Sequence, residues 1–218
     1  MTKDSPLRIL LFLTSILIAS IAMATEEPKY TVLQKSEPFE LRVYAPLILA
    51  EVSVTGDLDS ASSQGFRLIA AYIFGQNQVS EKISMTAPVG IEADSESKSA
   101  KIEMTAPVTV EGGILPKDRD NSRWTVSFVM PSEYTFSTLP KPLNSLVHIR
   151  EVPAAKKAVI QFSGFYNEEK VLEKTQALEE WIRVMGLQAV GSPQFARYNP
   201  PWTLPFMRRN EVMIQVRD

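Results

Sequence analysis

Cysteine is absent from the 218 residues of the chain, and histidine occurs once. Without cysteine there is no disulfide, no thiolate zinc site and no cysteine-linked cofactor or lipid. The sequence also shows no Ser-His-acid arrangement, no zinc-ligand spacing, no phosphate-binding loop and no dinucleotide fingerprint. The sequence therefore offers no recognisable catalytic constellation.

An excess of one charge sign is also missing, because the formal net charge is −2. The longest basic runs are the pairs Lys156–Lys157 and Arg208–Arg209, which are too short to attract a nucleic acid. Apolar residues make up 44% and charged residues 22%, a composition typical of globular proteins. The length allows one domain with a sizeable core.

Long apolar runs are missing except at the N-terminus, over residues 9–24. Lys3 and Arg8 precede this run, and Ala22-Met23-Ala24 ends it, a pattern that predicts a signal peptide over 1–24 cut after Ala24. The alternative is an uncleaved anchor, although the run is shorter than the roughly 20 residues that span a bilayer. We expect an exported product without a membrane span, periplasmic in a Gram-negative cell and otherwise secreted.

The rest of the chain, residues 25–218, alternates between strand and helix patterns. Strand, strand, helix, strand and strand follow one another twice, which predicts one α+β domain, a distorted antiparallel β-barrel with two helices and a twofold pseudo-repeat. Strands are expected within 30–44 and at 47–54, 82–89, 101–108, 123–130, 145–152, 156–163, 194–198 and 211–216, and helices at 60–75 and 167–186.

Two nearly identical octets, KISMTAPV (82–89) and KIEMTAPV (101–108), flank a polar stretch at 90–100. Their period-two alternation predicts the two arms of one hairpin, and one register sets Met85 beside Met104. These methionines either line a pocket wall or belong to the core. The octets are unsuited to form a metal-binding site, because two methionine thioethers bind few metal ions other than copper(I).

The helix expected at 60–75 is apolar on nearly all sides and carries one basic residue, Arg67. A surface helix needs a single apolar stripe. This helix is therefore either deeply buried or has one side for the core and another for a ligand or partner. One stripe consists of Phe66, Ile69, Ala70 and Ile73.

The segment NPPWTLPFMRRN (199–210) is a proline-stiffened loop with exposed aromatic candidates. Such a loop can hold a flat apolar ligand with acidic groups, or it can plug one end of the barrel with an arginine paired to Glu211 or another acid. Its candidate binding residues are Pro200, Pro201, Trp202, Phe206 and Arg208.

The single histidine, His148, lies in the strand expected at 145–152. Such a histidine is typically structural or exposed, and an axial metal-ligand role is the alternative.

Taken together, the octets and the tail YNPPWTLPFMRRNEVMI (198–214) resemble the SOUL haem-binding protein family, over residues 29–217. The resemblance implies non-covalent binding of haem or another tetrapyrrole beside the first helix and the loop before the last strand. By position it implicates Phe66, Ile69, Ala70, Ile73 and the loop from Pro200 to Phe206.

The chain also departs from its animal relatives. Positions that carry basic residues on the first helix in some of them match Ser63 and Ala71 here, and the N-terminal half has no histidine.

We therefore expect a haem carrier or buffer that performs no chemistry, with no protein partner identified. One alternative is a small-molecule hydrolase, which needs a tyrosine beside Glu103 or Glu211. The other is an interaction module that docks a partner through 199–210.

Overall fold

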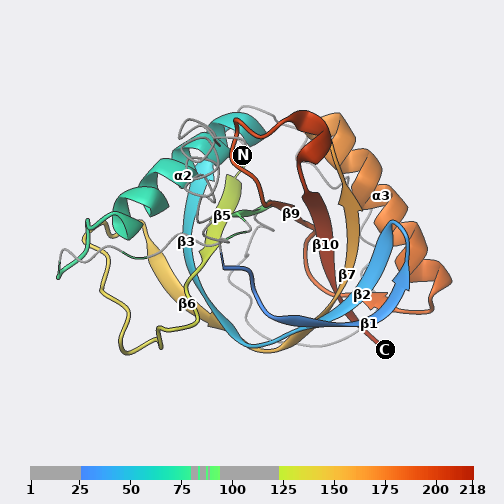
Figure 1. Cartoon of the computed structure of the whole chain (residues 1–218), viewed down its shortest axis with the longest axis horizontal. Coiled ribbons are helices and arrows are strands. Elements are labelled where there is room, and N and C mark those ends of the chain that lie inside the picture. Colours follow the sequence, from blue (N-terminus) through green and yellow to red (C-terminus); the bar gives the residue numbers. More distant parts are fainter. Residues whose placement is uncertain (1–25, 80–82, 84–86, 88, 94–122) are drawn as a thin grey trace, which may run out of the picture.

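The computed structural model describes residues 26–79, 83, 87, 89–93 and 123–218, and in these it contains one ten-stranded antiparallel sheet and two α-helices (Figure 1). The expected α+β class is confirmed. The sheet is open, with β1 and β6 at its two ends, so the barrel is only approximate. The strands are β1 Tyr30–Ser36, β2 Phe39–Tyr44, β3 Leu47–Thr55, β4 Val89–Ala93, β5 Arg123–Val129, β6 His148–Val152, β7 Ala155–Phe162, β8 Gln188–Ala189, β9 Gln194–Arg197 and β10 Asn210–Arg217, and the helices are α2 Leu58–Ile73, α3 Glu168–Val184 and the 3-10 turn η2 Pro205–Met207.

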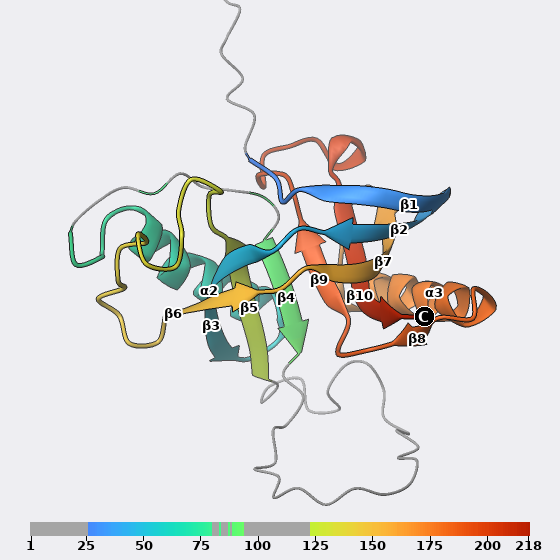
Figure 2. The same ribbon diagram turned by 90° about the horizontal axis from the view of Figure 1, so that it is seen from below.

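The pseudo-repeat is visible in how the strands pair. One unit is β2-β3-α2-β4-β5 and the other is β6-β7-α3-β9-β10, with β1 and β8 as additions. Strand β2 of the first unit pairs with β7 of the second, and β6 of the second pairs with β3 of the first. Figure 2 shows β4 and β9, which pair with each other, side by side at the centre of the sheet.

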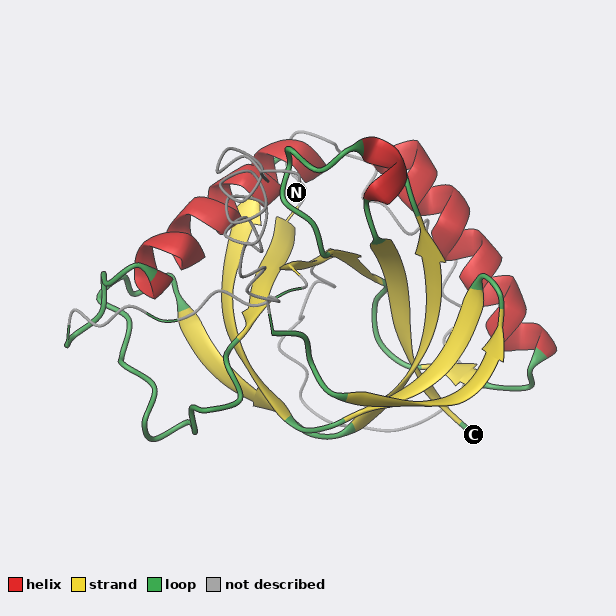
Figure 3. Cartoon of the chain, in the orientation of Figure 1, coloured by secondary structure: helices red, strands yellow, loops and turns green. Residues whose placement is uncertain are grey.

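Both helices pack on the outer face of the curved sheet (Figure 3). Alternation along each strand sends one set of side chains to a helix and the other set to the concave face. In β3, for example, Ala50 and Val52 join the core, whereas Glu51 lines the concave face. In β10, Val212 and Ile214 join the core, whereas Met213 lines the concave face.

Side-chain caps fix where the two helices begin. Asp57 accepts the backbone N–H of Ser60 at 2.8 Å, so α2 starts at Leu58, two residues before the start expected at 60. Asn167 accepts the N–H of Lys170 at 2.8 Å and caps α3, at the first residue of the helix expected over 167–186. Gly65 lets α2 approach the sheet, since a Cβ there would lie 2.5 Å from Val126 Cβ.

The octets correspond only in part to strands. Strand β4 begins at Val89, and residues 90–93, expected in a loop, belong to it and pair with both β5 and β9. Ile83 and Ala87 are buried outside any strand. The proline at 88 removes a ladder donor just before β4, which fits a strand start at that point. Met85 and Met104 lie outside the described residues, as does the whole second octet.

Candidate functional site

The residues expected to bind a ligand on α2 separate into two groups. Ile69 and Ile73 are 0% exposed and pack in the core between helix and sheet, and Ala70 is also buried. Phe66 is 37% exposed, with its ring 5.5 Å from that of Phe128, and Arg67 is exposed. Of these five, only Phe66 and Arg67 present side chains to solvent.

The proline-rich loop keeps its large apolar side chains in solvent. Trp202 is 83% and Phe206 74% exposed, and Pro200 and Pro201 are exposed as well. Soluble proteins seldom expose such groups together without a function. We call this surface the apolar loop, and its members are Phe165, Trp202, Leu204, Phe206 and Met207.

Hydrogen bonds from Arg208 hold the backbone of the apolar loop in place. Its Nε donates to the carbonyl of Thr203 at 2.8 Å and its Nη2 to that of Pro201 at 2.6 Å. Its guanidinium lies 5.1 Å from the centre of the Phe165 ring. The N–H of Gly164 donates to the Pro205 carbonyl at 2.9 Å, which ties η2 to the segment before α3. These bonds fix the backbone of the apolar loop relative to the segment before α3.

A side chain that the sequence reasoning overlooked connects α2 with the apolar loop. Arg197 at the end of β9 donates Nη2 to Ser62 Oγ on α2 and Nη1 to Tyr166 Oη, the residue after Phe165. Its guanidinium also lies 5.2 Å from the Tyr166 ring centre. The sequence did contain a sign of this role. Arg197 lies two residues after Phe195 in an expected strand, so its charged side chain shares a face with a core residue.

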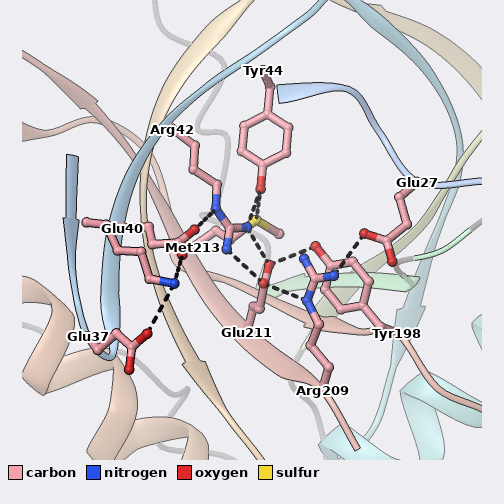
Figure 4. Close-up of polar contacts among 10 residues, drawn as sticks. Glu27, Glu37, Glu40, Arg42, Tyr44, Tyr198, Arg209, Glu211 and Met213 are labelled. Atoms are coloured by element: carbon pink, nitrogen blue, oxygen red, sulfur yellow. Dashed lines mark hydrogen bonds and ion pairs between the residues drawn. The ribbon is translucent and has the colours of Figure 1, made fainter. Parts of the chain in front are cut away.

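The concave face carries a buried ionic network around Glu211, which is 0% exposed (Figure 4). Arg42 donates Nη2 to its Oε1 and Nη1 to its Oε2, both at 3.0 Å. Arg209 Nε adds a bond to Oε1 at 2.9 Å, and the Tyr198 hydroxyl adds one to Oε2 at 2.7 Å. A loop arginine paired with Glu211, part of one of the two alternatives for the loop, is thus observed in Arg209.

The network shifts the pKa values of its members. Burial alone would lower the pKa of Arg42, but the bonds to Glu211 raise it above its ordinary value. Burial raises the pKa of Tyr44 to about 12 and raises that of Tyr198 as well. The chemical consequence concerns Glu211, whose two oxygens accept four donors. It has no free lone pair directed at a substrate, so it is not placed to act as a general base. Glu103 lies outside the described residues.

Two cavities lie away from the apolar loop. A concave chamber of about 270 Å³ is lined largely by apolar side chains, with several charged and polar residues among them. In it, Arg150 Nη2 donates to Glu51 at 2.9 Å, and Lys157 donates to Gln194 at 2.7 Å. Burial lowers the pKa of Lys157. The chamber thus combines apolar walls with polar side chains that bond to one another.

A second cavity, the rim cavity, measures about 590 Å³ and lies between the first described residues and the turn after β5. Its charged lining residues are Glu26, Glu27, Lys29 and Glu151. The acidic excess makes it a poor place for an anionic ligand.

His148 lies exposed on β6, the last strand of the sheet, and lines neither cavity. Among the described residues no group of three or more His, Cys, Asp or Glu side chains could hold a metal ion. The described residues therefore place no histidine near the apolar loop.

Comparison with known proteins decides the family. The model of the SOUL heme-binding protein family matches residues 25–99 and 91–215. The chain belongs to the SOUL heme-binding protein family. Human Heme-binding protein 2 is 32% identical over 199 residues, which covers 88% of this chain and 87% of that protein. The mouse protein of the same name is 30% identical over 198 residues, with 88% and 86% covered.

Solved structures share the fold at low sequence identity. The crystal structure of the EcmrR C-terminal domain is similar with a TM-score of 0.58 and 12% identity, covering 87% of this chain and 98% of that one. A hydrolase from Listeria innocua gives a TM-score of 0.50 and 11% identity, with 93% and 98% covered. These likenesses concern the fold alone.

Proposed function

We propose that the chain binds haem or a similar tetrapyrrole non-covalently, as a carrier or buffer that performs no chemistry on it. The observation that carries the proposal is the apolar loop, a rigid surface with Trp202 and Phe206 largely in solvent. Membership of a haem-binding family supports the ligand class. A porphyrin face covering such side chains gains about 25 cal/mol per Å² of apolar area buried.

Electrostatics favours the apolar loop and Phe66 over both cavities. Haem carries two carboxylates, which the acidic rim cavity would repel. The concave chamber has apolar walls as well, but its cations Arg150 and Lys157 already donate to Glu51 and Gln194. Beside the apolar loop and on α2 lie Arg208 and Arg67, neither of which forms an ion pair with a described carboxylate. The residues present thus fit a flat apolar anion, and Phe66, Trp202 and Phe206 would hold its faces.

Axial ligation by histidine is not part of the proposal. His148 lies on an end strand, outside the proposed surface. Affinity would come from apolar contact and from the carboxylates, so other porphyrins of the same shape would compete with haem.

Export is the second part of the proposal. The charged start, the apolar run at 9–24 and the exit Ala22-Met23-Ala24 support cleavage after Ala24, and the family match begins at residue 25. The described part of the chain contains no helix with the length and apolar character needed to cross a membrane. The proposed product is a periplasmic or secreted binding protein.

Titration with hemin, followed by the Soret band, tests the binding site. We expect a dissociation constant below about 10 µM for the wild type, and a loss of about tenfold or more in Phe66→Asp/Trp202→Asp, because two contact rings become charges. The matched control is Val184→Asp, another exposed apolar residue, at the far end of α3. Absence of hemin binding, or equal binding by the site variant, would refute the proposed site.

The exposure of Trp202 also suits an interaction module that docks a protein partner. Porphyrin binding and protein docking can be distinguished by repeating the hemin titration in the presence of a co-purifying protein. Competition between a porphyrin and a co-purifying protein at this surface would support both, whereas protein binding without any porphyrin binding would favour the module.

A further inference from the structure

The concave chamber contains a lysine amine that the proposed function does not use. Lys157 on β7 lines this chamber of about 270 Å³, and so does Gln194 on β9, to which the amine donates at 2.7 Å. The amine also lies 5.5 Å from the centre of the ring of Tyr44, which lines the chamber as well. These contacts place the nitrogen at the chamber wall, within reach of a molecule bound there.

The bonding of this amine leaves capacity for a ligand. Its hydrogen-bond partner among the described residues is the neutral amide oxygen of Gln194. A neutral amine that donates one N–H to this oxygen keeps its lone pair for another partner. Lys156, the next residue on the opposite face of β7, is bonded differently, because it pairs with Asp218 at 2.5 Å.

The surroundings favour the neutral form of the Lys157 amine. Burial lowers its pKa, and the positive charge of Arg150 acts in the same direction. Glu92, which accepts a bond from Gln194 at 2.9 Å, acts against them without cancelling their effect. A larger share of this amine is therefore neutral than of an exposed lysine, and the neutral amine is the nucleophilic form.

The chamber also offers apolar surface for the body of a ligand. Leu49 and Met213 belong to its wall. Six further apolar residues line both the chamber and the rim cavity, namely Pro28, Ala45, Leu47, Val129, Val152 and Pro153. The two hollows therefore adjoin along an apolar border, and an aliphatic chain that starts at Lys157 has this surface to lie on.

The charges of the two hollows indicate that the ligand is neutral. Glu51 and Glu92 line the chamber, and the rim cavity beyond the apolar border has an acidic excess. These carboxylates disfavour an anion. An uncharged carbonyl compound with an apolar body suits the amine and the walls better than a carboxylate does.

We propose that the concave chamber binds an aldehyde with an apolar body and that Lys157 holds it as an imine. The nitrogen lone pair attacks the carbonyl carbon and forms the C–N bond. The carbonyl oxygen then leaves as water together with the two amine protons, and a C=N bond remains, without oxidation or reduction of either partner. This reversible capture is a second activity beyond the proposed function, at a site separate from the apolar loop.

Incubation of the wild type with hexanal and sodium cyanoborohydride tests the proposal, because the hydride reduces an imine to a stable secondary amine. Peptide mapping by mass spectrometry should find the adduct on Lys157 in about tenfold higher yield than on any other lysine, which corresponds to the burial of about two methylene groups. Glycolaldehyde has the same reactive group without an apolar body and should show no such preference.

Two variants and a denatured sample serve as controls. Lys157→Arg keeps a cation in the chamber and should lose the dominant adduct, whereas Lys156→Arg should retain it. Labelling of the wild type in denaturing urea should abolish the preference, since the chamber is then absent.

The adduct map of the wild type decides the outcome even where a variant fails to fold. An even spread of hexanal over the lysines of the native protein would overturn the proposal. Equal preference with glycolaldehyde would also overturn it, because the chamber would then not select an apolar body. A preference that persists in urea would come from the local sequence and would contradict the chamber as the binding site.

Discussion

At the scale of single residues, two arginine–glutamate pairs bridge strands in the same sheet in different surroundings. Arg42 and Glu211 are fully buried, whereas Arg150 beside Glu51 is half exposed. Both arginines use two nitrogens on the partner carboxylate. A buried pair is costly to break because the remaining charge cannot reach water, and an exposed pair contributes little.

The first prediction compares these two pairs. Arg42→Leu should lower the free energy of unfolding by about 3 to 5 kcal/mol, since Glu211 stays buried with only Arg209 as a cationic partner. Arg150→Leu should cost less than about 1 kcal/mol. Urea unfolding of both variants measures the difference, and equal losses would contradict the account of the network.

Sequence reasoning recovered some residue roles and missed others for a physical reason. Asn167 as a helix cap and an arginine paired with Glu211 were predictable, because both depend on near neighbours in the chain. Arg42 as the principal partner of Glu211 was not, because 169 positions separate the two and only the pairing of β2, β7 and β10 brings them together. Arg197 acts through Ser62, 135 positions away, for the same reason.

At the scale of elements, period-two alternation was sufficient to predict most of the strands and the pseudo-repeat. It failed at 90–93, where residues expected in a polar loop form most of β4. Backbone pairing with β5 on one side and β9 on the other stabilises this strand, although its local sequence has no strand pattern. Periodicity also could not tell which side of α2 was free. Both Ile69 and Phe66 belong to its apolar surface, but only the close packing of the helix on β5 decides that Ile69 is covered.

The second prediction concerns this packing. Gly65→Ala should destabilise the protein by about 1 to 3 kcal/mol despite the better helix propensity of alanine, because the new Cβ would lie 2.5 Å from Val126 Cβ. Ser63→Ala, at an exposed position on the same helix, should be neutral or slightly stabilising. Thermal unfolding of both variants measures the effect, and a stabilising Gly65→Ala would show that α2 shifts freely on the sheet.

At the scale of the whole molecule, burial of tyrosines in the concave network gives stability a pH dependence. The pKa of Tyr44 is raised to about 12 in the folded chain, against about 10 for an exposed tyrosine. The group therefore contributes stability that is fully present below pH 10 and is lost as pH rises towards 12. Tyr198 shifts in the same direction.

The third prediction follows from this sign. Between pH 10 and 12 the free energy of unfolding should fall by about 1.4 kcal/mol per pH unit for each such tyrosine. Tyr44→Phe should show a smaller slope, because one ionisable group is removed. Urea titrations at pH 8, 10 and 11 compare the two proteins, and parallel curves would show that Tyr44 ionises equally in both states.

The exchange of strands between the two repeat units has a consequence for how the chain can evolve. Each unit completes the other's part of the sheet, with β2 beside β7 and β6 beside β3. The dependence reaches the helices, since Phe39 from the first unit stacks on Trp181 of the second at 5.4 Å. Separating the two units would break the pairing of β2 with β7, β3 with β6 and β4 with β9, so we expect neither unit to fold alone. Substitutions along these shared strand pairs are therefore expected to be constrained by both units at once.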